Sequence, residues 1–283
     1  MSLVDTHCHL NFKAFEGGQS KIIRRAKDVG VDLFVIPGTD IKTSQHAVKL
    51  ASEHEDVFAV VGVHPHHIHN YSISSFDEDW SSDRLLIENM LSEPKVVGVG
   101  EIGLDRHKYF ASRHGDGIEI TNETFNLQKK IFLSQIELAA NYDKAVVIHN
   151  RESKSELIEF INNHKSIFEK FSKRLVFHCC EAELELLEIA KKHGFFIGVD
   201  GDVTFDEVKR SFIGEVPIEL LVLETDSPYI LPEPLKSQKK FPNTPASIPL
   251  IAQAVASIKN IEISKVEEVT TQNAYELFGI TKI

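Results

Sequence analysis

Six side chains that can bind metal ions each fall at or near the end of a short apolar run typical of a β-strand. They are His7, His9, Glu101, His149, His178 and Asp226. Parallel strands that close into a barrel present their carboxyl ends on one face, so this repeated placement predicts that these side chains meet. Imidazoles and carboxylates form a nitrogen and oxygen ligand set, which suits one or two divalent cations with open coordination positions. The pattern therefore indicates metal-assisted hydrolysis.

The spacing within these segments supports a shared site. His7 and His9 are two residues apart, which places both on one face of a strand and Cys8 on the other. Glu101 is flanked by apolar residues, so burying its carboxylate unpaired would be costly, and a bridging cation would remove that cost. Asp226 precedes a turn fixed by a proline and is a candidate ligand and general base. We therefore assign catalytic roles to Glu101 and Asp226.

Each of these residues also has an ordinary structural alternative. A His-x-His pair can lie in a surface loop, and Glu101 can be solvated at a strand end. His149 or His178 alone is more typical of a hydrogen-bonded core histidine, and Asp226 could cap a turn. Their combination at the same end of several strands is what favours metal binding.

Two further residues are candidates for binding the substrate. His64 follows the third apolar run, at a strand end expected on the same face as the ligands. Arg151 lies two residues after His149 and could bind a phosphate through two parallel hydrogen bonds. Its alternative role is a salt bridge to Glu152 or Glu156. We assign His64 and Arg151, as hypotheses, to substrate binding.

The elements that must position these residues alternate along the chain. Strands are predicted near residues 3–9, 33–37, 57–63, 95–101, 145–149, 174–179, 195–199 and 219–225. The strand runs are apolar on successive positions, as expected when both faces of a sheet are covered, and segments with helical spacing separate them. We predict an α/β fold, a (β/α)8 TIM-type barrel with the metal site at the carboxyl ends of its strands. An open doubly wound sheet is the alternative.

Two long loops complete this outline. Residues 106–121 follow the fourth predicted strand and residues 230–244 follow the eighth, so both should border the site. No repeat, low-complexity tract or linker divides the sequence, and its 283 residues suffice for one barrel, which typically has about 250. We therefore expect residues 1–283 to form a single domain.

The composition limits the class of protein. Hydrophobic residues make up 42% of the chain and charged residues 26%, as in an ordinary globular protein. No apolar run approaches the roughly 18 residues of a membrane span, and no basic-then-apolar segment opens the chain. Three cysteines, two of them adjacent, favour a reducing compartment, so we expect a cytoplasmic protein without a membrane partner. The net charge of −11 argues against a broad nucleic-acid-binding surface, but divalent ions could still supply positive charge at a phosphate.

Several motifs occur in the order typical of one enzyme family. They are DTHCHL at 5–10, GVHPH at 62–66, GEIGLD at 100–105, FHC at 177–179, ETDSPY at 224–229, PNTP at 242–245 and TTQNAYELFG at 270–279. Together they resemble the TatD family of metal-dependent deoxyribonucleases, among the amidohydrolase-like barrels. The resemblance covers the chain from end to end, and its motifs are specific in combination.

The resemblance implies a centre of two divalent ions bridged by Glu101. The other ligands would divide between the ions, with His7, His9 and Asp226 on one and His149 and His178 on the other. Mg²⁺ is the usual activator in the family, and Zn²⁺ or Mn²⁺ would also suit these ligands.

Two segments depart from the family's pattern. Residues 180–182 read Cys-Glu-Ala where the family usually has a small Ser-Gly pair, and the insert RHKYFASRHGDG follows GEIGLD. Neither segment contains a predicted ligand, but both could reshape the mouth of the site and alter the choice of substrate.

The leading hypothesis is hydrolysis of DNA phosphodiester bonds by a monomeric exodeoxyribonuclease that acts on a single strand or an end. A metal-activated water would attack the phosphorus, and Asp226 would accept its proton as general base. The alternative is a metal-dependent hydrolase of a small ester, amide or lactone on the same barrel, because barrel hydrolases change substrate by loop variation. A metal-binding scaffold without turnover is a third hypothesis, which the complete ligand set disfavours.

Overall fold

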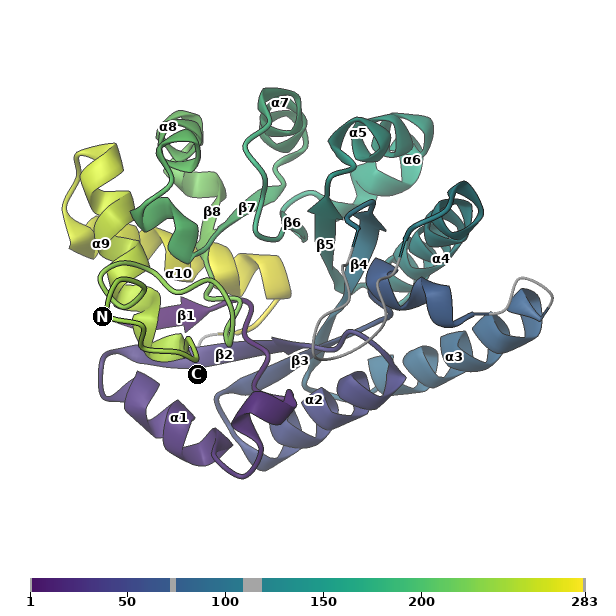
Figure 1. The fold of residues 1–283 in the computed structure, drawn as a ribbon, viewed down its shortest axis with the longest axis horizontal. Helices are drawn as coiled ribbons and strands as arrows, with labels where there is room; N and C mark the ends of the chain where they lie inside the picture. The colour runs from purple at the N-terminus through teal and green to yellow at the C-terminus, as the bar shows by residue number, and fades with distance from the viewer. Residues whose placement is uncertain (1, 72–74, 109–118, 282–283) are drawn as a thin grey trace.

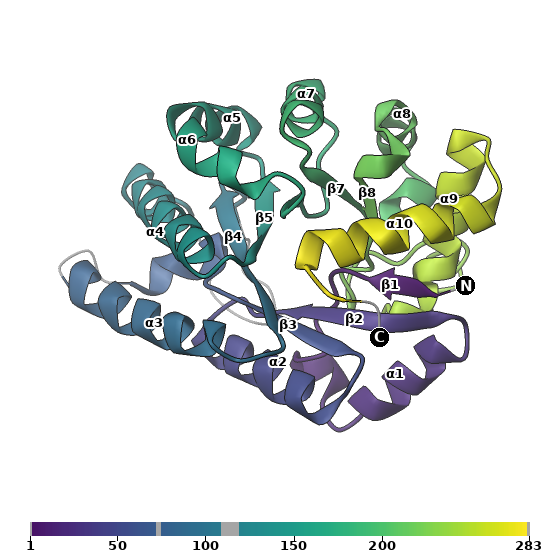
Figure 2. The same cartoon turned by 180° about the vertical axis from the view of Figure 1, so that it is seen from behind.

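Eight parallel strands form the centre of the described structure, and helices surround them (Figures 1 and 2). This computed structural model describes residues 2–71, 75–108 and 119–281. The strands are β1 (Leu3–Asp5), β2 (Val31–Pro37), β3 (Val57–Val61), β4 (Val96–Asp105), β5 (Ala145–Arg151), β6 (Leu175–Phe177), β7 (Phe196–Val199) and β8 (Leu221–Leu223). They pair in sequence order, each parallel to the next. The prediction of a (β/α)8 TIM-type barrel is confirmed.

The helices alternate with the strands along the chain and lie outside them (Figure 1). They are α1 (Gln19–Lys27), α2 (Ile41–Glu53), α3 (Phe76–Leu91), α4 (Asn122–Asn141), α5 (Lys154–Asn163), α6 (Lys165–Phe168), α7 (Leu184–His193), α8 (Glu207–Glu215), α9 (Ile248–Lys259) and α10 (Ile263–Phe278). None of the helices in the described ranges combines the length and the apolar character that crossing a membrane requires.

Successive residues of a strand contribute to two separate apolar clusters. In β2, Leu33 and Val35 belong to a cluster formed mainly by the strands themselves, whereas Phe34 and Ile36 pack with residues of the surrounding helices. All four side chains are buried. Because both faces of the sheet are covered, the strand sequences are apolar at nearly every position.

The last helix covers the amino-terminal end of the barrel, as Figure 2 shows. The Asn273 side chain in α10 donates to the carbonyl oxygen of Leu221 at 2.7 Å, and the Thr271 hydroxyl donates to that of Ser2 at 2.6 Å. Leu277 of the same helix joins the apolar cluster inside the strands. The amino-terminal end is therefore closed by packing, and the loops at the carboxyl end are left to form a site.

A buried carboxylate joins the first and eighth strands, between which the described residues form no strand ladder. Asp5 accepts hydrogen bonds from the backbone nitrogens of His7 and Thr225, at 3.2 and 3.0 Å. It also accepts one from the Thr225 hydroxyl at 2.6 Å, and its side chain is fully buried. The carboxylate thus holds together the two segments that carry His7 and Asp226.

The first strand is shorter than predicted. It ends at Asp5 and not near residue 9, so His7 and His9 lie in the segment that follows it. In that segment Cys8 makes an isolated parallel bridge with Ser227. The chain leaves the strand there because its hydrogen bonds pass to the residues after β8.

The fourth strand is longer than predicted, which changes the position of Glu101. β4 continues to Asp105 because it keeps pairing with β5 as far as Arg151. Glu101 therefore lies within the strand and not at its end. The register between β4 and β5 shifts between Val99 and Ile102, an irregularity on either side of Glu101.

We expect Asp5→Ala to lower the free energy of unfolding by about 2–4 kcal/mol, because it leaves buried donors of His7 and Thr225 without an acceptor. Asp5→Asn should cost less, since an amide oxygen can still accept from both backbone nitrogens. Urea unfolding of the two variants measures this difference. Equal loss of stability in both would show that these hydrogen bonds do not stabilise the contact between the segments that follow β1 and β8.

Candidate metal centre

The residues predicted to bind metal and substrate meet around one large cavity. Its volume is about 820 Å³. Of the eight predicted site residues, those that line it are His9, His64, Glu101, His149, Arg151, His178 and Asp226. The eighth, His7, is buried next to them, with its Nε2 3.3 Å from that of His9. The sequence argument therefore placed all of these positions together, while their individual roles remain predictions.

His7, His9 and Asp226 form one group of converging ligand atoms. Asp226 Oδ1 lies 3.2 Å from His9 Nε2 and 3.8 Å from His7 Nε2. The Asp226 backbone nitrogen donates to the His7 carbonyl oxygen at 2.9 Å, and the His9 backbone nitrogen donates to the Ser227 carbonyl oxygen at 2.8 Å. Backbone hydrogen bonds across the seam between β1 and β8 thus fix the positions of all three side chains.

Glu101 lies at the centre of the histidine cluster and presents its two oxygens to different neighbours. Oε2 lies 3.5 Å from His7 Nε2 and 3.8 Å from His9 Nε2. Oε1 lies 2.9 Å from His149 Nδ1 and 3.6 Å from His178 Nε2. A carboxylate that faces two sets of imidazoles in this way is suited to bridge two cations.

The donor set of this centre fits divalent cations. The Nε2 atoms of His7 and His9 point toward each other and toward carboxylate oxygens, and their buried Nδ1 atoms have no hydrogen-bond partner among the described residues. Imidazole nitrogens and carboxylate oxygens that converge within 4 Å in a buried site are ligands suited to a cation.

The electrostatics of the centre also favour positive charge. Burial lowers the pKa of His178, but the charges of Glu224 and Glu101 outweigh burial and raise this pKa to about 10. Burial likewise opposes protonation of His149, yet hydrogen bonds to Asp105 and Glu101 raise its pKa to about 9. Burial tends to raise the pKa of Glu101, but the neighbouring histidines hold it well below its usual range. The carboxylates therefore attract protons when no cation is bound.

Two further carboxylates contact the outer sides of the histidine rings. From the sequence, Glu224 shares a strand face with Asp226 and was a candidate for supporting the site or for a simple ion pair, whereas Asp105 was not assigned. Asp105 Oδ2 lies 3.0 Å from His149 Nε2, and Glu224 Oε1 lies 3.1 Å from His178 Nδ1. Such carboxylates orient metal-binding imidazoles and raise their basicity. The even spacing of Glu101 and Asp105 in one strand was the signal that could have identified Asp105.

Glu224 occupies space left by a glycine in the neighbouring strand. A Cβ atom at Gly198 in β7 would lie 2.3 Å from Glu224 Oε1. The Glu224 carboxylate also accepts a hydrogen bond from the Cys179 backbone nitrogen at 2.5 Å. Gly198 is therefore required for Glu224 to reach His178.

The two predicted substrate-binding residues lie on the β3 and β5 side of the cavity. His64 Nε2 is 3.4 Å from Glu101 Oε1, and its Nδ1 accepts from the backbone nitrogen of His66 at 2.9 Å. Arg151 is exposed at the end of β5, next to the buried cluster. Glu156, one of its suggested salt-bridge partners, is bound by Arg106 at 2.7 Å. Substrate binding by His64 and Arg151 stays a prediction.

The loop that follows β8 borders the cavity, since Tyr229 and Ile230 line it. The other predicted loop, residues 106–121, contains residues 109–118, which lie outside the described residues. Its predicted position beside the site therefore stays a prediction.

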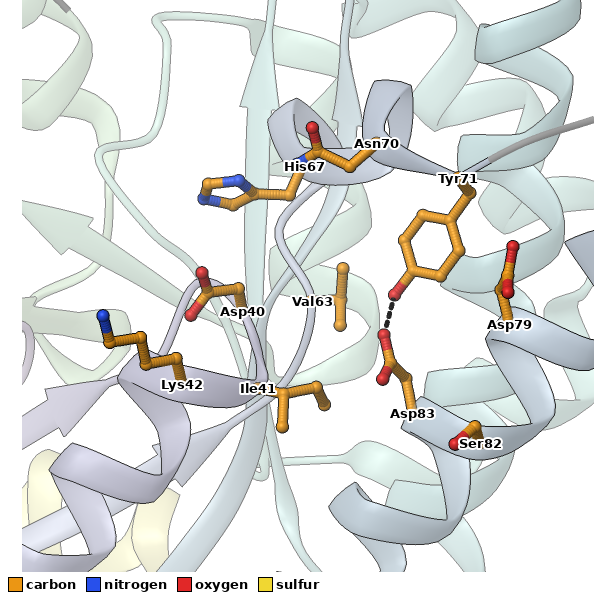
Figure 3. Close-up of a pocket in the computed structure, with 10 residues that line it drawn as sticks. All are labelled: Asp40, Ile41, Lys42, Val63, His67, Asn70, Tyr71, Asp79, Ser82 and Asp83. Atoms are coloured by element: carbon orange, nitrogen blue, oxygen red, sulfur yellow. Dashed lines mark hydrogen bonds between the residues drawn. The ribbon is translucent and has the colours of Figure 1, made fainter.

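A second, smaller cavity lies on the α2 and α3 side of the molecule (Figure 3). Its volume is about 480 Å³, and Asp40, Tyr71 and Asp83 are among the residues that line it. The Tyr71 hydroxyl donates to Asp83 at 2.5 Å. None of the predicted metal ligands lines this cavity, so we place the chemistry in the larger one.

Loss of a residue that only hydrogen-bonds a metal ligand typically lowers metal affinity by up to roughly 100-fold. We expect Glu101→Ala to lower it by more, because the variant loses a carboxylate that faces both sets of imidazoles. Elemental analysis after dialysis, with circular dichroism to verify folding, measures this effect. Glu93→Ala, at an exposed position, is the matched control. Unchanged metal content in folded Glu101→Ala protein would exclude the bridging role.

We expect metal binding at pH 7 to release about two protons, because a protonated imidazole cannot act as a ligand. His149 and His178, whose pKa values are raised to about 9 and about 10, are the groups that must lose them. Affinity should therefore increase with pH up to this range and fall on acidification. Titration calorimetry in buffers of different ionisation enthalpy counts the protons. Metal content that stays constant down to about pH 4 would contradict histidine ligation.

Comparison with known proteins identifies one family over nearly the whole chain. Residues 4–279 match the family model described as TatD related DNase. The chain is 30% identical over 287 residues to the 3'-5' ssDNA/RNA exonuclease TatD of Edwardsiella piscicida, an alignment that covers 98% of this chain and 100% of that protein. It is 27% identical over 282 residues to the uncharacterized metal-dependent hydrolase YabD of Bacillus subtilis, with 98% and 99% covered. The crystal structure of YjjV, a TatD homolog from Escherichia coli, has a TM-score of 0.82 at 25% identity, with 99% of this chain and 98% of that chain covered. The chain therefore belongs to the TatD related DNase family of metal-dependent hydrolases.

Proposed function

We propose that the protein hydrolyses phosphodiester bonds of single-stranded DNA from an end, as a metal-dependent exodeoxyribonuclease. The observation that carries this proposal is the position of Glu101 between two sets of imidazoles, beside a cavity of about 820 Å³. The names of relatives described as 3'-5' ssDNA/RNA exonucleases support the choice of nucleic acid and of the 3' end.

The proposed cofactors are two divalent ions, with Mg²⁺ as the activating metal. The ligands of one would be His7, His9 and Asp226, those of the other His149 and His178, with Glu101 shared. Divalent ions in such a site lower the pKa of a bound water and neutralise charge on the phosphate oxygens. The carboxylates of Asp105 and Glu224 would keep the imidazole rings of His149 and His178 in position.

Asp226 is the proposed general base. Its side chain is partly exposed, at 15%, in a centre where Glu101 and His7 are almost fully buried. Its carboxylate can therefore reach a water molecule in the cavity and accept a proton from it. Arg151, which lines the same cavity, would bind the phosphate and hold it against the centre.

Aromatic side chains beside the centre suit unpaired bases. Tyr229 lines the cavity with 53% of its surface exposed, and Phe12, which is half-buried, stacks on the His9 ring at a centroid distance of 4.2 Å. The Phe12 and Tyr229 rings lie 6.5 Å apart. Bases of a single strand can stack on such rings, whereas bases inside a duplex are not available to them.

The three cysteines of the chain are free thiols. They accord with the proposed location in a reducing, cytoplasmic compartment.

We expect the purified protein with Mg²⁺ or Mn²⁺ to release nucleotides from single-stranded DNA, and Asp226→Asn to lower kcat at saturating metal by at least about 100-fold. Asp28→Asn, which changes an exposed acid that does not line the cavity, is the control and should retain full activity. Turnover of small esters, amides or lactones without nuclease activity would favour the alternative substrate class. Full activity in Asp226→Asn would exclude proton transfer by this residue.

A further inference from the structure

One side of the large cavity is formed by acidic residues from the segments that follow β6 and β7. They are Glu181, Asp200 and Asp202, here called the acidic wall, and all three line the cavity. Asp200 is fully buried, and Glu181 and Asp202 are half-buried. Glu181 belongs to the segment, residues 180–182, that departs from the pattern of the family.

The acidic wall adjoins the proposed metal centre. Ligand atoms of His178, Cys179 and Asp226 lie within 4.8 Å of one another, and so do those of Cys179, Asp200 and Glu224. The Cys179 side chain therefore lies between Asp226 and the wall. A substrate that places its scissile phosphate at the centre can therefore place a neighbouring group against the wall.

One oxygen of each carboxylate in the wall lacks a hydrogen-bond donor, whereas Asp200 Oδ1 accepts from the backbone nitrogen of Asp202 at 2.9 Å. Glu181 Oε2, Asp200 Oδ2 and Asp202 Oδ1 are buried and have no hydrogen-bond partner among the described residues. The closest cation to Asp200 Oδ2 given by the structure is Lys209 Nζ, at 3.9 Å, which exceeds hydrogen-bond distance. Buried acceptors of this kind are costly unless a ligand or solvent supplies donors.

Lys209 does not convert the wall into an anion site. Its ammonium donates to the Cys180 carbonyl at 2.7 Å and lies 3.3 Å from Asp202 Oδ2. It is almost fully buried, at 5% exposure. This ammonium thus lies within 4 Å of two of the three carboxylates, those of Asp200 and Asp202. Burial, together with the charge of Asp200 beside it, also raises the pKa of Asp202. Adding a further negative charge next to these carboxylates is therefore unfavourable.

We infer that the acidic wall binds the hydroxyl-bearing 3' end of the substrate strand and excludes a 3' end that carries a phosphate. The inference rests on the proposed nuclease function. A sugar hydroxyl supplies a donor to the unpartnered oxygens, whereas a terminal phosphate brings two further negative charges against them. The scissile phosphate is not affected, since the ions and Arg151 would neutralise it.

The test compares single-stranded oligonucleotides of one sequence that end in a 3'-hydroxyl or a 3'-phosphate, with Mn²⁺ and the full-length protein. We expect kcat/KM for the hydroxyl end to exceed that for the phosphate end by at least about 30-fold, as unscreened like charges imply. The double variant Glu181→Gln, Asp202→Asn should reduce this ratio by at least about tenfold, mainly through faster cleavage of the phosphate end. Glu181→Gln alone, at a half-buried loop position, should reduce it in part.

The matched control is Glu207→Gln, Glu215→Gln, which removes the same charge from exposed positions of α8. Its ratio should equal that of the unaltered protein. Equal cleavage of both ends, an equal change in the control, or degradation from the 5' end would overturn the inference and leave the nuclease function standing. A third divalent ion per chain, lost in Asp200→Asn, would also overturn it, because the wall would then bind metal. Cleavage of neither oligonucleotide would refute the nuclease function and, with it, this inference.

Discussion

The hydrogen bonds of the Asp5 carboxylate are the interaction on which the rest of the site depends. They join Asp5 to Thr225, residues separated by 220 positions in the sequence, at the one place in the described barrel where neighbouring strands form no ladder. The same segments carry His7 and His9 on one side and Asp226 on the other. A change at this seam would therefore separate ligands as well as strands, and stability and metal binding are coupled through one buried carboxyl group.

The charge balance of the centre follows from its depth in the barrel. Burial removes water from Glu101, and histidines replace it at distances of 2.9 to 3.8 Å. Asp105 and Glu224 stand behind two of these rings and add negative charge. The cluster is thus more acidic than its histidines can neutralise without taking up protons. Divalent cations would balance this charge and release the protons, which is why metal binding and protonation must compete.

The barrel and the positions of the ligands could be predicted because both follow from local patterns. An apolar run followed by a polar residue marks the end of a buried strand, and a parallel barrel gathers such ends. The placement of Glu101 within β4 could not be predicted, since the strand length depends on pairing with β5 as far as Asp105 and Arg151.

Contacts between residues of separate strands could not be predicted from the sequence either. Glu224 reaches His178 only because Gly198 leaves room in β7, and Asp200 faces the cavity through the register of that strand. These contacts depend on three-dimensional neighbours and not on the residues adjacent in the sequence. In each case the signal was a carboxylate at a strand end, but its partner could be identified only from the fold.

The helix across the amino-terminal end of the strands has a consequence for turnover. In the described part of the chain, side chains fill the interior of the barrel and α10 covers its amino-terminal end, so the cavity is open only at the carboxyl end of the strands. A strand cannot thread through such a chamber, and the product must leave by the opening through which the substrate arrived. Each cycle then requires the shortened strand to withdraw before it advances again, which favours distributive over processive degradation.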